Sequence, residues 1–467
     1  MCCFKKYFRV FIAVTFVISV SSCMTYYQIN ESFNSAFIDG KMEEANLILD
    51  KDKKAEKRKT KFIHYMNKGI TEQLLGHHEL SNEYFEKAYI FGEDYQKNYL
   101  NIAASFLTNP NMIVYKGESF EHLLVNYYKS LNYLFLENYD AALVEAKRME
   151  IRLHFYNDKV IVKKDSTKYN KDAFIQNLMG IIYQADRDYN NAYIAYRNAF
   201  KIYKKFNTKY LGMIVPEQLK TDMMYCAYKS GFHDDIDFYN RKWETKYEYV
   251  ARGKETVFLW HNGLVPVKDE WSINFFVFEG AGGYVNFKNE DLGIDFPFYV
   301  GDREKKASTL GDIKTLRVAF PKYVNRDPFY HSAYLEIEGQ QYNFSYGQNM
   351  DGIARKSLKD RMMKELGSSL IRLATKKATE ARIRKENEAL GALAGIANAI
   401  TEKADTRHCQ TLPNQIHYTR VPRLDSAQQV RLHCQGNGSN SRTFELTIPP
   451  NAPFYLFHTM DSKQRIW

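Results

Sequence analysis

Long apolar runs are missing from the sequence beyond its first 22 residues. A helix that crosses a membrane needs about 20 mostly apolar residues, so we expect no spanning helix. The short motifs of hydrolytic and metal-dependent chemistry are missing too, because there is no HExxH, no paired metal-ligand spacing and no G-x-S-x-G. We therefore predict a protein that is not an enzyme and has neither a metal site nor a cofactor.

Cysteine is scarce, with six in 467 residues. Cys2 and Cys3 precede the first apolar run, and Cys226 lies in a helical pattern, where a small buried hydrophobe is expected. Cys409 and Cys434 flank one C-terminal segment, and an oxidising compartment would permit a disulfide between them. The sequence does not supply the geometry of such a bridge, so free thiols remain the alternative.

The N-terminus has the layout of a secretory signal. Three basic residues precede an apolar run over residues 10–20, and Ser21-Ser22-Cys23 follows. Small residues directly before a cysteine resemble a bacterial lipobox; the alternative is an ordinary signal with a chance cysteine. The lipobox predicts that residues 1–22 are removed, which lowers the formal net charge from +10 to +7, and that Cys23 becomes a lipidated N-terminus.

Lipidation of Cys23 would set the location of the protein. Several acyl chains, palmitate among them, hold a protein on a membrane far better than one. We expect a bacterial cell-envelope protein on the outer membrane, facing the periplasm, in which residues 23–61 form the lipidated N-terminus, a tether and the first helices.

Residues 62–250 carry a helical repeat. The clearest copy spans residues 173–200 and contains a glycine followed by aromatic residues and alanines: Gly180, Tyr183, Tyr189, Ala192, Tyr196 and Ala199. This spacing matches the tetratricopeptide pattern, in which small residues let two antiparallel helices approach closely. We assign these residues to the repeat core rather than to a ligand site.

Weaker copies occur over residues 35–49, 62–89, 123–149 and 217–243, without a strict period. An array of stacked helical pairs offers a concave face to a segment of another protein. The sequence therefore predicts protein partners in the envelope.

The run from Lys51 to Lys61 is rich in lysine. Contact with anionic lipid near the anchor is one interpretation; a solvated helix face or loop is the other. Nucleic acid is not expected as a partner, because no recognised binding module accompanies the run.

Residues 255–348 change to alternating, aromatic-rich segments typical of strands. An Asn262-Gly263 pair between two such segments predicts a hairpin turn. Trp260, His261, Asn262 and Gly263 are candidates for a junction or binding site, although a structural role for His261 is the stronger interpretation.

Residues 349–404 return to a helical period, and their apolar patch over 389–400 contains Gly391 and Gly395. A buried helix–helix contact is the first interpretation of this patch; an oligomer contact or a membrane-surface helix is the other. Residues 405–467 then offer four short strands, which we expect to complete a sandwich-like module with residues 255–348.

Three motifs give a resemblance: WHNGLVP at 260–266, MDGIARKSLKDRM at 350–362 and ADTRHCQTLP at 404–413. With them the chain resembles, over about residues 60–460, a family of bacterial lipoproteins with tetratricopeptide-like repeats and a C-terminal ADTR…LP β-module. His408-Cys409 departs from the family, where a tryptophan is expected nearby. The resemblance implies no enzyme activity, and some relatives resemble neighbours of lipoproteins that act on cell-wall synthesis.

The sequence as a whole predicts an α+β protein, with a tetratricopeptide-like helical array followed by a β-rich module that a long helix interrupts. The leading hypothesis is a lipid-anchored, non-enzymatic scaffold or adaptor. One alternative is an enzyme or ligand carrier whose cleft between array and module is lined by Trp260, His261, Asp405 and Arg407; another is a subunit of an export or assembly complex. Asp405 and Arg407 lie after the long helix, and we predict that they clamp it onto the β-module.

Overall fold

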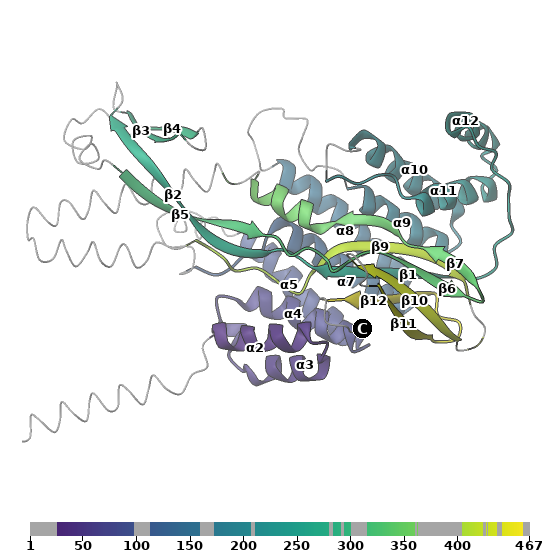
Figure 1. Ribbon diagram of the computed structural model, residues 1–467, viewed down its shortest axis with the longest axis horizontal. Helices are drawn as coiled ribbons and strands as arrows, with labels where there is room; N and C mark the ends of the chain where they lie inside the picture. The colour runs from purple at the N-terminus through teal and green to yellow at the C-terminus, as the bar shows by residue number, and fades with distance from the viewer. Residues whose placement is uncertain are drawn as a thin grey trace, which may run out of the picture.

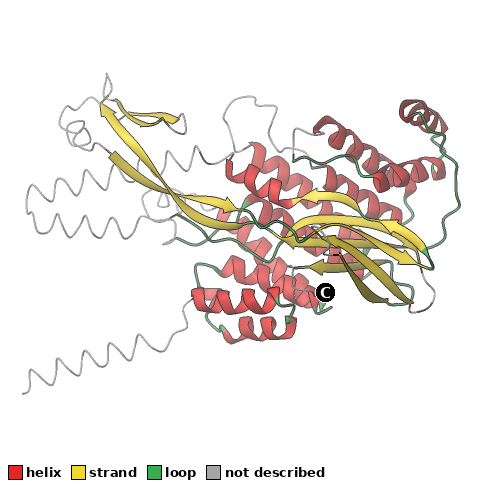
Figure 2. Ribbon diagram, viewed as in Figure 1, coloured by secondary structure: helices red, strands yellow, loops and turns green. Residues whose placement is uncertain are grey.

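Helices dominate the first half of the chain and strands the second, so the predicted α+β class is confirmed (Figures 1 and 2). The structure, a computed structural model, describes residues 26–97, 113–158, 172–206, 211–279, 284–290, 294–299, 315–359, 404–423, 428–436 and 441–460, with Met362 and Ser426. The predicted signal, Cys23 and the apolar patch at 389–400 lie outside these residues. Of the long helix expected over 349–404, residues 349–359, Met362 and Ala404 are described. Residues 350–359 and Met362 are helical, whereas Asn349 ends a strand and Ala404 lies in neither a helix nor a strand.

The helical part consists of consecutive antiparallel hairpins, with the short η1 (Ala55–Lys57) between the first two. They are α2 (Tyr26–Ile38) with α3 (Met42–Lys51), α4 (Lys61–Leu74) with α5 (His78–Lys97), α7 (Ser119–Phe135) with α8 (Tyr139–Asp158), α9 (Ala173–Ala185) with α10 (Tyr189–Phe206), and α11 (Glu217–Lys229) with α12 (His233–Trp243).

The same turn closes all of these hairpins. Its key residue has a left-handed φ between 53° and 80°, at Gly40, Gly76, Glu137, Arg187 and Gly231. The next residue donates its N–H five residues back, as Lys41 does to Ala36 and Asp188 to Tyr183. This is the Schellman arrangement, which satisfies carbonyls at the end of a helix. Recurrence of one turn indicates an internal structural repeat.

Small residues bring the two helices of a hairpin together. A Cβ atom on Gly69 would lie 2.8 Å from the ring of Phe85, and a Cβ on Gly180 would overlap the ring of Tyr196. Ser130 takes the equivalent place in the α7–α8 hairpin and donates to the carbonyl of Ala142 at 2.9 Å. The aromatic rings thus fill a groove that only a small residue leaves open.

Two four-stranded sheets form the β-module. The first sheet has the order β12 (Phe454–Thr459), β1 (Glu255–Leu264), β9 (Pro413–Pro422), β8 (Ser345–Asn349), and the second has the order β11 (Ser441–Ile448), β10 (Gln428–Gly436), β6 (Tyr330–Ile337), β7 (Gln340–Asn343). β1 pairs in parallel with β12, and every other pair in these two sheets is antiparallel. Strands from the C-terminal tail therefore complete both sheets.

The first sheet is buried on both faces, because apolar side chains alternate between two cores along β1. Val257 and Leu259 belong to the core shared with the helices, whereas Phe258 and Trp260 belong to a second core between the two sheets. The result is three layers: the helical array, the first sheet and the second sheet (Figure 2). The face of the array that we expected to be open is covered by the chain's own strands.

A third sheet, with the order β4 (Ile294–Tyr299), β3 (Tyr284–Asn289), β2 (Val267–Glu279), β5 (Thr315–Val324), extends from the body as an arm (Figure 1). Along β2, Phe275 and Val277 are buried, whereas Phe276 and Phe278 are each 52% exposed. The arm therefore has one buried and one partly exposed face.

The hairpin predicted at Asn262-Gly263 is wrong. Both residues lie inside β1, and the segment that follows, β2, pairs with β5 and not with β1. The Asn262 amide donates to the carbonyl of Tyr330 at 2.7 Å instead of closing a turn. Among the described residues, no helix is long and apolar enough to cross a membrane.

Candidate functional site

Asp405 and Arg407 form a closed ion pair at the junction between the helical array and the β-module. The Arg407 Nε and Nη2 atoms donate to the two carboxylate oxygens of Asp405, both at 2.8 Å, and Nη1 donates to the carbonyl of Ile113 at 2.9 Å. Burial disfavours the carboxylate, but the Arg407 guanidinium outweighs it and holds the pKa of Asp405 below its usual value. Every nitrogen of this guanidinium is thus engaged within the protein.

Within the described residues, this clamp ties the segment over residues 404–412 to the chain just before α7. The long helix that we expected it to hold lies outside the described residues, apart from residues 350–359 and Met362. The start of the same segment is held by β2, because the Ala404 N–H donates to the Glu270 carboxylate at 2.6 Å.

A buried acid–base cluster continues the junction at the N-terminus of α7. Lys268 of β2 pairs with Glu118, and the two side chains are 1% and 3% exposed. Glu121 accepts from Tyr115 Oη at 2.7 Å and from the Cys409 N–H at 2.6 Å. Burial and the neighbouring Glu118 carboxylate raise the pKa of Glu121 to about 7. Glu121 therefore gains or loses its proton near neutral pH.

Sequence reasoning missed this cluster. Glu118 and Glu121 have the spacing of a capping box, in which each side chain satisfies a backbone N–H at a helix start, and the structure contains that box. That pattern could have been read from the sequence. The pairing with Lys268 could not, since 150 residues separate the partners.

Of the two alternatives for Cys409 and Cys434, the structure has the free thiols, and both are buried. Cys409 belongs to the core shared with the helices, and Cys434 belongs to the core between the sheets. The Cys409 thiol lies 3.4 Å from Asn67 Oδ1 and 3.2 Å from Thr411 Oγ1. Burial raises the pKa of each thiol to about 12, so neither is a ready nucleophile or metal ligand.

Residues 404–422 run along the inner face of the array as a bound peptide would. Gln410 accepts from Asn34 of α2 at 3.2 Å, and Thr411 donates to Asn67 of α4 at 3.0 Å. Further along, the segment enters β9 and reaches the last hairpins. Their contacts with it centre on Arg420.

Arg420 of β9 forms a second clamp, which the sequence did not reveal. Its Nε donates to the fully buried Asp222 of α11 at 2.8 Å, and its Nη2 donates to Tyr196 Oη at 2.9 Å. Arg252 approaches the other oxygen of Asp222 at 2.9 Å. Two arginines thus hold one buried carboxylate and fix β9 to the array.

The four residues 260–263 do not form one site. Trp260 and Asn262 share a hydrogen-bond network with Thr459 on the sandwich side of β1. His261 points to the helices, where its Nε2 lies 2.8 Å from Tyr127 Oη and its ring lies 4.6 Å from that of His458. Successive side chains of a strand point to opposite faces of the sheet, so His261 is separated from Trp260 and Asn262.

Gly263 has a structural requirement of its own. Its φ is +65°, and a Cβ atom there would lie 3.0 Å from the side chain of Pro328. Backbone conformation and close approach both favour glycine at this position.

Within the described residues, the array and the module pack directly against each other where the alternative hypothesis placed a cleft. A cavity of about 30 Å³ in this interface is lined mainly by apolar side chains, Leu123, Phe174 and Ile416 among them. Such a volume holds at most a water molecule or two. Asp172 at its edge accepts from Gln348 at 2.6 Å, and burial raises the pKa of Asp172 to about 6.

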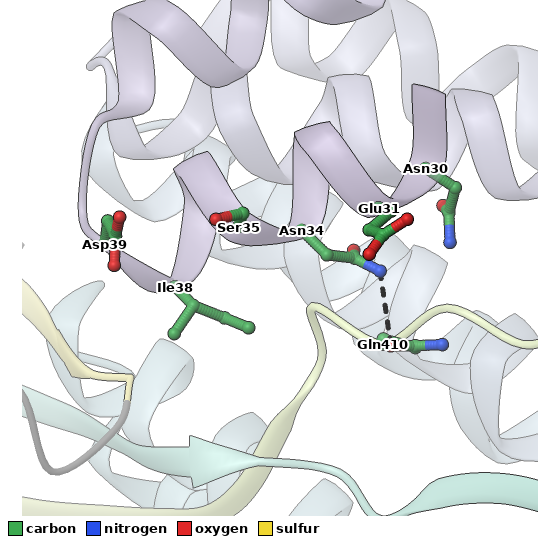
Figure 3. A pocket seen from close by; sticks show the side chains of 7 residues that line it. All are labelled: Asn30, Glu31, Asn34, Ser35, Ile38, Asp39 and Gln410. Carbon is green, nitrogen blue, oxygen red and sulfur yellow. Dashed lines mark hydrogen bonds between the residues drawn. The ribbon is translucent and has the colours of Figure 1, made fainter. Parts of the chain in front are cut away.

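An open pocket of about 560 Å³ lies beside α2 (Figure 3). It is lined by six polar residues and one isoleucine: Asn30, Glu31, Asn34, Ser35, Ile38, Asp39 and Gln410. Its amides and carboxylates could hydrogen-bond a small polar ligand. In the part of the chain that the structure describes, no group of three or more His, Cys, Asp or Glu residues could hold a metal ion.

No protein-family model matches the chain, and no curated protein matches it. Among solved structures, the chain is similar to MamA 41-end from Desulfovibrio magneticus RS-1, at 14% identity and with a TM-score of 0.30. That match covers 47% of this chain and 94% of the other. A likeness of this strength adds nothing to the fold described above.

Proposed function

We propose that the chain is a lipid-anchored bacterial cell-envelope protein that acts as a non-enzymatic, protein-binding scaffold. The observation that carries the proposal is the repeat itself. Consecutive helical hairpins share one turn, and two of them, α4–α5 and α9–α10, pack a small residue against an aromatic ring, at Gly69 with Phe85 and at Gly180 with Tyr196. These features are typical of tetratricopeptide-like arrays, whose extended surfaces bind other proteins.

The partner contacts the outer helices in this proposal. Within the described residues, the inner face of the array packs against β8, β9 and β1. The outer helices α5 and α8 instead present apolar side chains to solvent, since Ile90 is 50% exposed and Ile151 is 68% exposed. Ile90 and Ile151 are the side chains that we expect the partner to contact.

The anchor is supported by the sequence around Cys23 and by the resemblance to bacterial lipoproteins. Metabolic labelling with a radioactive fatty acid tests it: the wild-type protein should carry the label and the Cys23→Ser variant should not. Crosslinking in membranes followed by purification should then recover a protein partner. Absence of label on the wild-type protein would end the proposal of a lipid anchor.

A further inference from the structure

Five lysines at the end of the first hairpin form an exposed cationic surface. This lysine face consists of Lys51, Lys53, Lys54, Lys57 and Lys59. All five are exposed, and among the residues that the structure describes none of them makes an ion pair.

The acidic residues within the lysine face do not neutralise it. Asp52 pairs with Arg58 at 2.9 Å, and Glu56 pairs with Lys87 at 3.1 Å. Each of these two acids is therefore paired with a base that is not one of the five lysines. The surface keeps its positive charge.

The hairpin geometry places the lysine face at the N-terminal end of α2. Lys51 is the last residue of α3, which runs antiparallel to α2 after the turn at Gly40, so it returns to the end where α2 begins at Tyr26 (Figure 1). The opposite end of the hairpin carries Glu43 and Glu44 in the first turn of α3. Charge is thus sorted along the hairpin, with the basic end next to the start of the described chain.

Cys23 precedes Tyr26 by three residues. Three extended residues span at most about 11 Å, which is close to the Debye length of roughly 8 Å at physiological ionic strength. An acyl chain on Cys23 would hold lipid headgroups within electrostatic reach of the lysine face. Clusters of lysine beside a membrane anchor attract anionic lipid, and a basic patch is the usual second signal that strengthens lipid anchoring.

We infer that the lysine face binds the headgroups of anionic phospholipids in the bilayer that carries the anchor. The inference rests on the proposed lipid anchor for its geometry. Two points of attachment at one end of the first hairpin fix the orientation of the whole array on the membrane.

Vesicle binding tests the inference on a chain that begins at Met24 and so carries no acyl group. The parent should bind vesicles of phosphatidylglycerol mixed with phosphatidylcholine, and it should not bind vesicles of phosphatidylcholine alone. Replacing the five lysines with glutamine should weaken binding at least about tenfold, since each lysine near an anionic surface contributes to attraction. A control variant makes the same charge change at exposed lysines elsewhere: Lys147, Lys201, Lys229, Lys246 and Lys254.

Equal loss of binding in the two variants would overturn the inference, as would equal binding to neutral vesicles or no binding by the parent. The result is separable from the test of the anchor. If Cys23 carries the fatty-acid label but the parent does not bind vesicles, the lipid-binding role of the lysine face is rejected and the anchor is kept. If the parent binds vesicles but Cys23 carries no label, the lipid-binding role of the lysine face is kept and the anchor is rejected.

Discussion

Arg407 is buried, and every nitrogen of its guanidinium group donates a hydrogen bond. Its side chain is 7% exposed, and its planar fork matches both oxygens of Asp405. Lysine has the same charge but not the fork, so it cannot make the two parallel bonds. Arg355 pairs with Asp351 through Nε alone, which donates to both carboxylate oxygens, in a setting where both side chains are about a third exposed. Arg355 therefore serves as a more exposed control for Arg407.

We predict that Arg407→Lys lowers the free energy of unfolding by about 1.5–3 kcal/mol, the range for hydrogen bonds to charged groups. Arg355→Lys should cost less than about 1 kcal/mol, because exposed ion pairs contribute little. Chemical denaturation of both variants measures the difference. Unchanged stability in Arg407→Lys, together with lost partner binding, would turn the clamp into a binding site.

Asp222 gives a second prediction at this scale, because it is fully buried between Arg420 and Arg252. Asp222→Ala should lower the free energy of unfolding by about 3–5 kcal/mol, since it leaves buried charge uncompensated. Glu248→Ala, which removes an exposed ion pair with Lys246, should change it by less than about 1 kcal/mol. Equal effects in the two variants, measured by urea unfolding, would show that β9 is not held by this carboxylate.

At the scale of the element, the helical hairpin depends on small residues where two helices cross. The clearest case is Gly180, whose α-carbon faces the ring of Tyr196 in the next helix. Gly253 offers a contrast, since nothing lies within 4 Å of a Cβ atom built there.

We predict that Gly180→Leu lowers the free energy of unfolding by about 1–3 kcal/mol through overpacking. Gly253→Leu should leave it within about 0.5 kcal/mol, as surface substitutions usually do. Thermal melting of the two variants of the full chain distinguishes them. An unaltered melting temperature for Gly180→Leu would mean that α9 and α10 do not cross at this residue.

The hairpins could be predicted from the sequence because their contacts are local. Gly69 with Phe85 and Gly180 with Tyr196 are each 16 residues apart, and the same offset can be found by eye along the chain. The sheets depend instead on distant partners. β1 pairs with β12 almost two hundred residues later, and no spacing in the sequence encodes that register.

The candidate site divides in the same way. The pairing of Asp405 with Arg407 spans two residues and could be predicted. The bond from Cys409 to Glu121 spans 288 residues and could not. The hairpin turn predicted at Asn262-Gly263 was wrong because this dipeptide lies inside a strand, where the carbonyl of Tyr330 accepts a hydrogen bond from the asparagine amide.

At the scale of the whole molecule, layered packing buries several histidines in the neutral form. Burial lowers the pKa of His122, His417 and His458 to about 3 and that of His408 to about 4. The unfolded chain takes up protons below the usual value of 6.5, whereas these folded imidazoles do not. Because the unfolded state then binds more protons, stability falls as the pH falls.

Two buried acids oppose this trend. Glu121 and Asp172, with pKa values raised to about 7 and about 6, hold protons in the folded state that the unfolded chain has released. Their contribution to stability is lost as the pH rises through those values and regained on acidification. Four histidines outweigh two carboxyl groups, so the net effect of acid is destabilising.

We therefore predict that the urea midpoint falls steadily between about pH 6.5 and about pH 4. His417→Gln should flatten this dependence, because it removes one proton-binding site of the unfolded chain. The exposed His331 is the control, and His331→Gln should keep the slope of the wild-type protein. A midpoint that does not change over this range would contradict the neutral, buried state of these imidazoles.

The three layers also determine where a partner can bind. Within the described residues, the helical array covers the first sheet with its inner face, whereas its outer helices are open to solvent. Ile90 and Ile151 lie on that surface, and Glu445 lies exposed on β11 of the second sheet.

Site-specific photo-crosslinking in living cells tests this arrangement most directly. A photoreactive residue at position 90 or 151 should give adducts with one and the same envelope protein, and one at position 445 should give none. Adducts from position 445 alone, or from none of the three positions, would contradict a scaffold that binds through its outer helices.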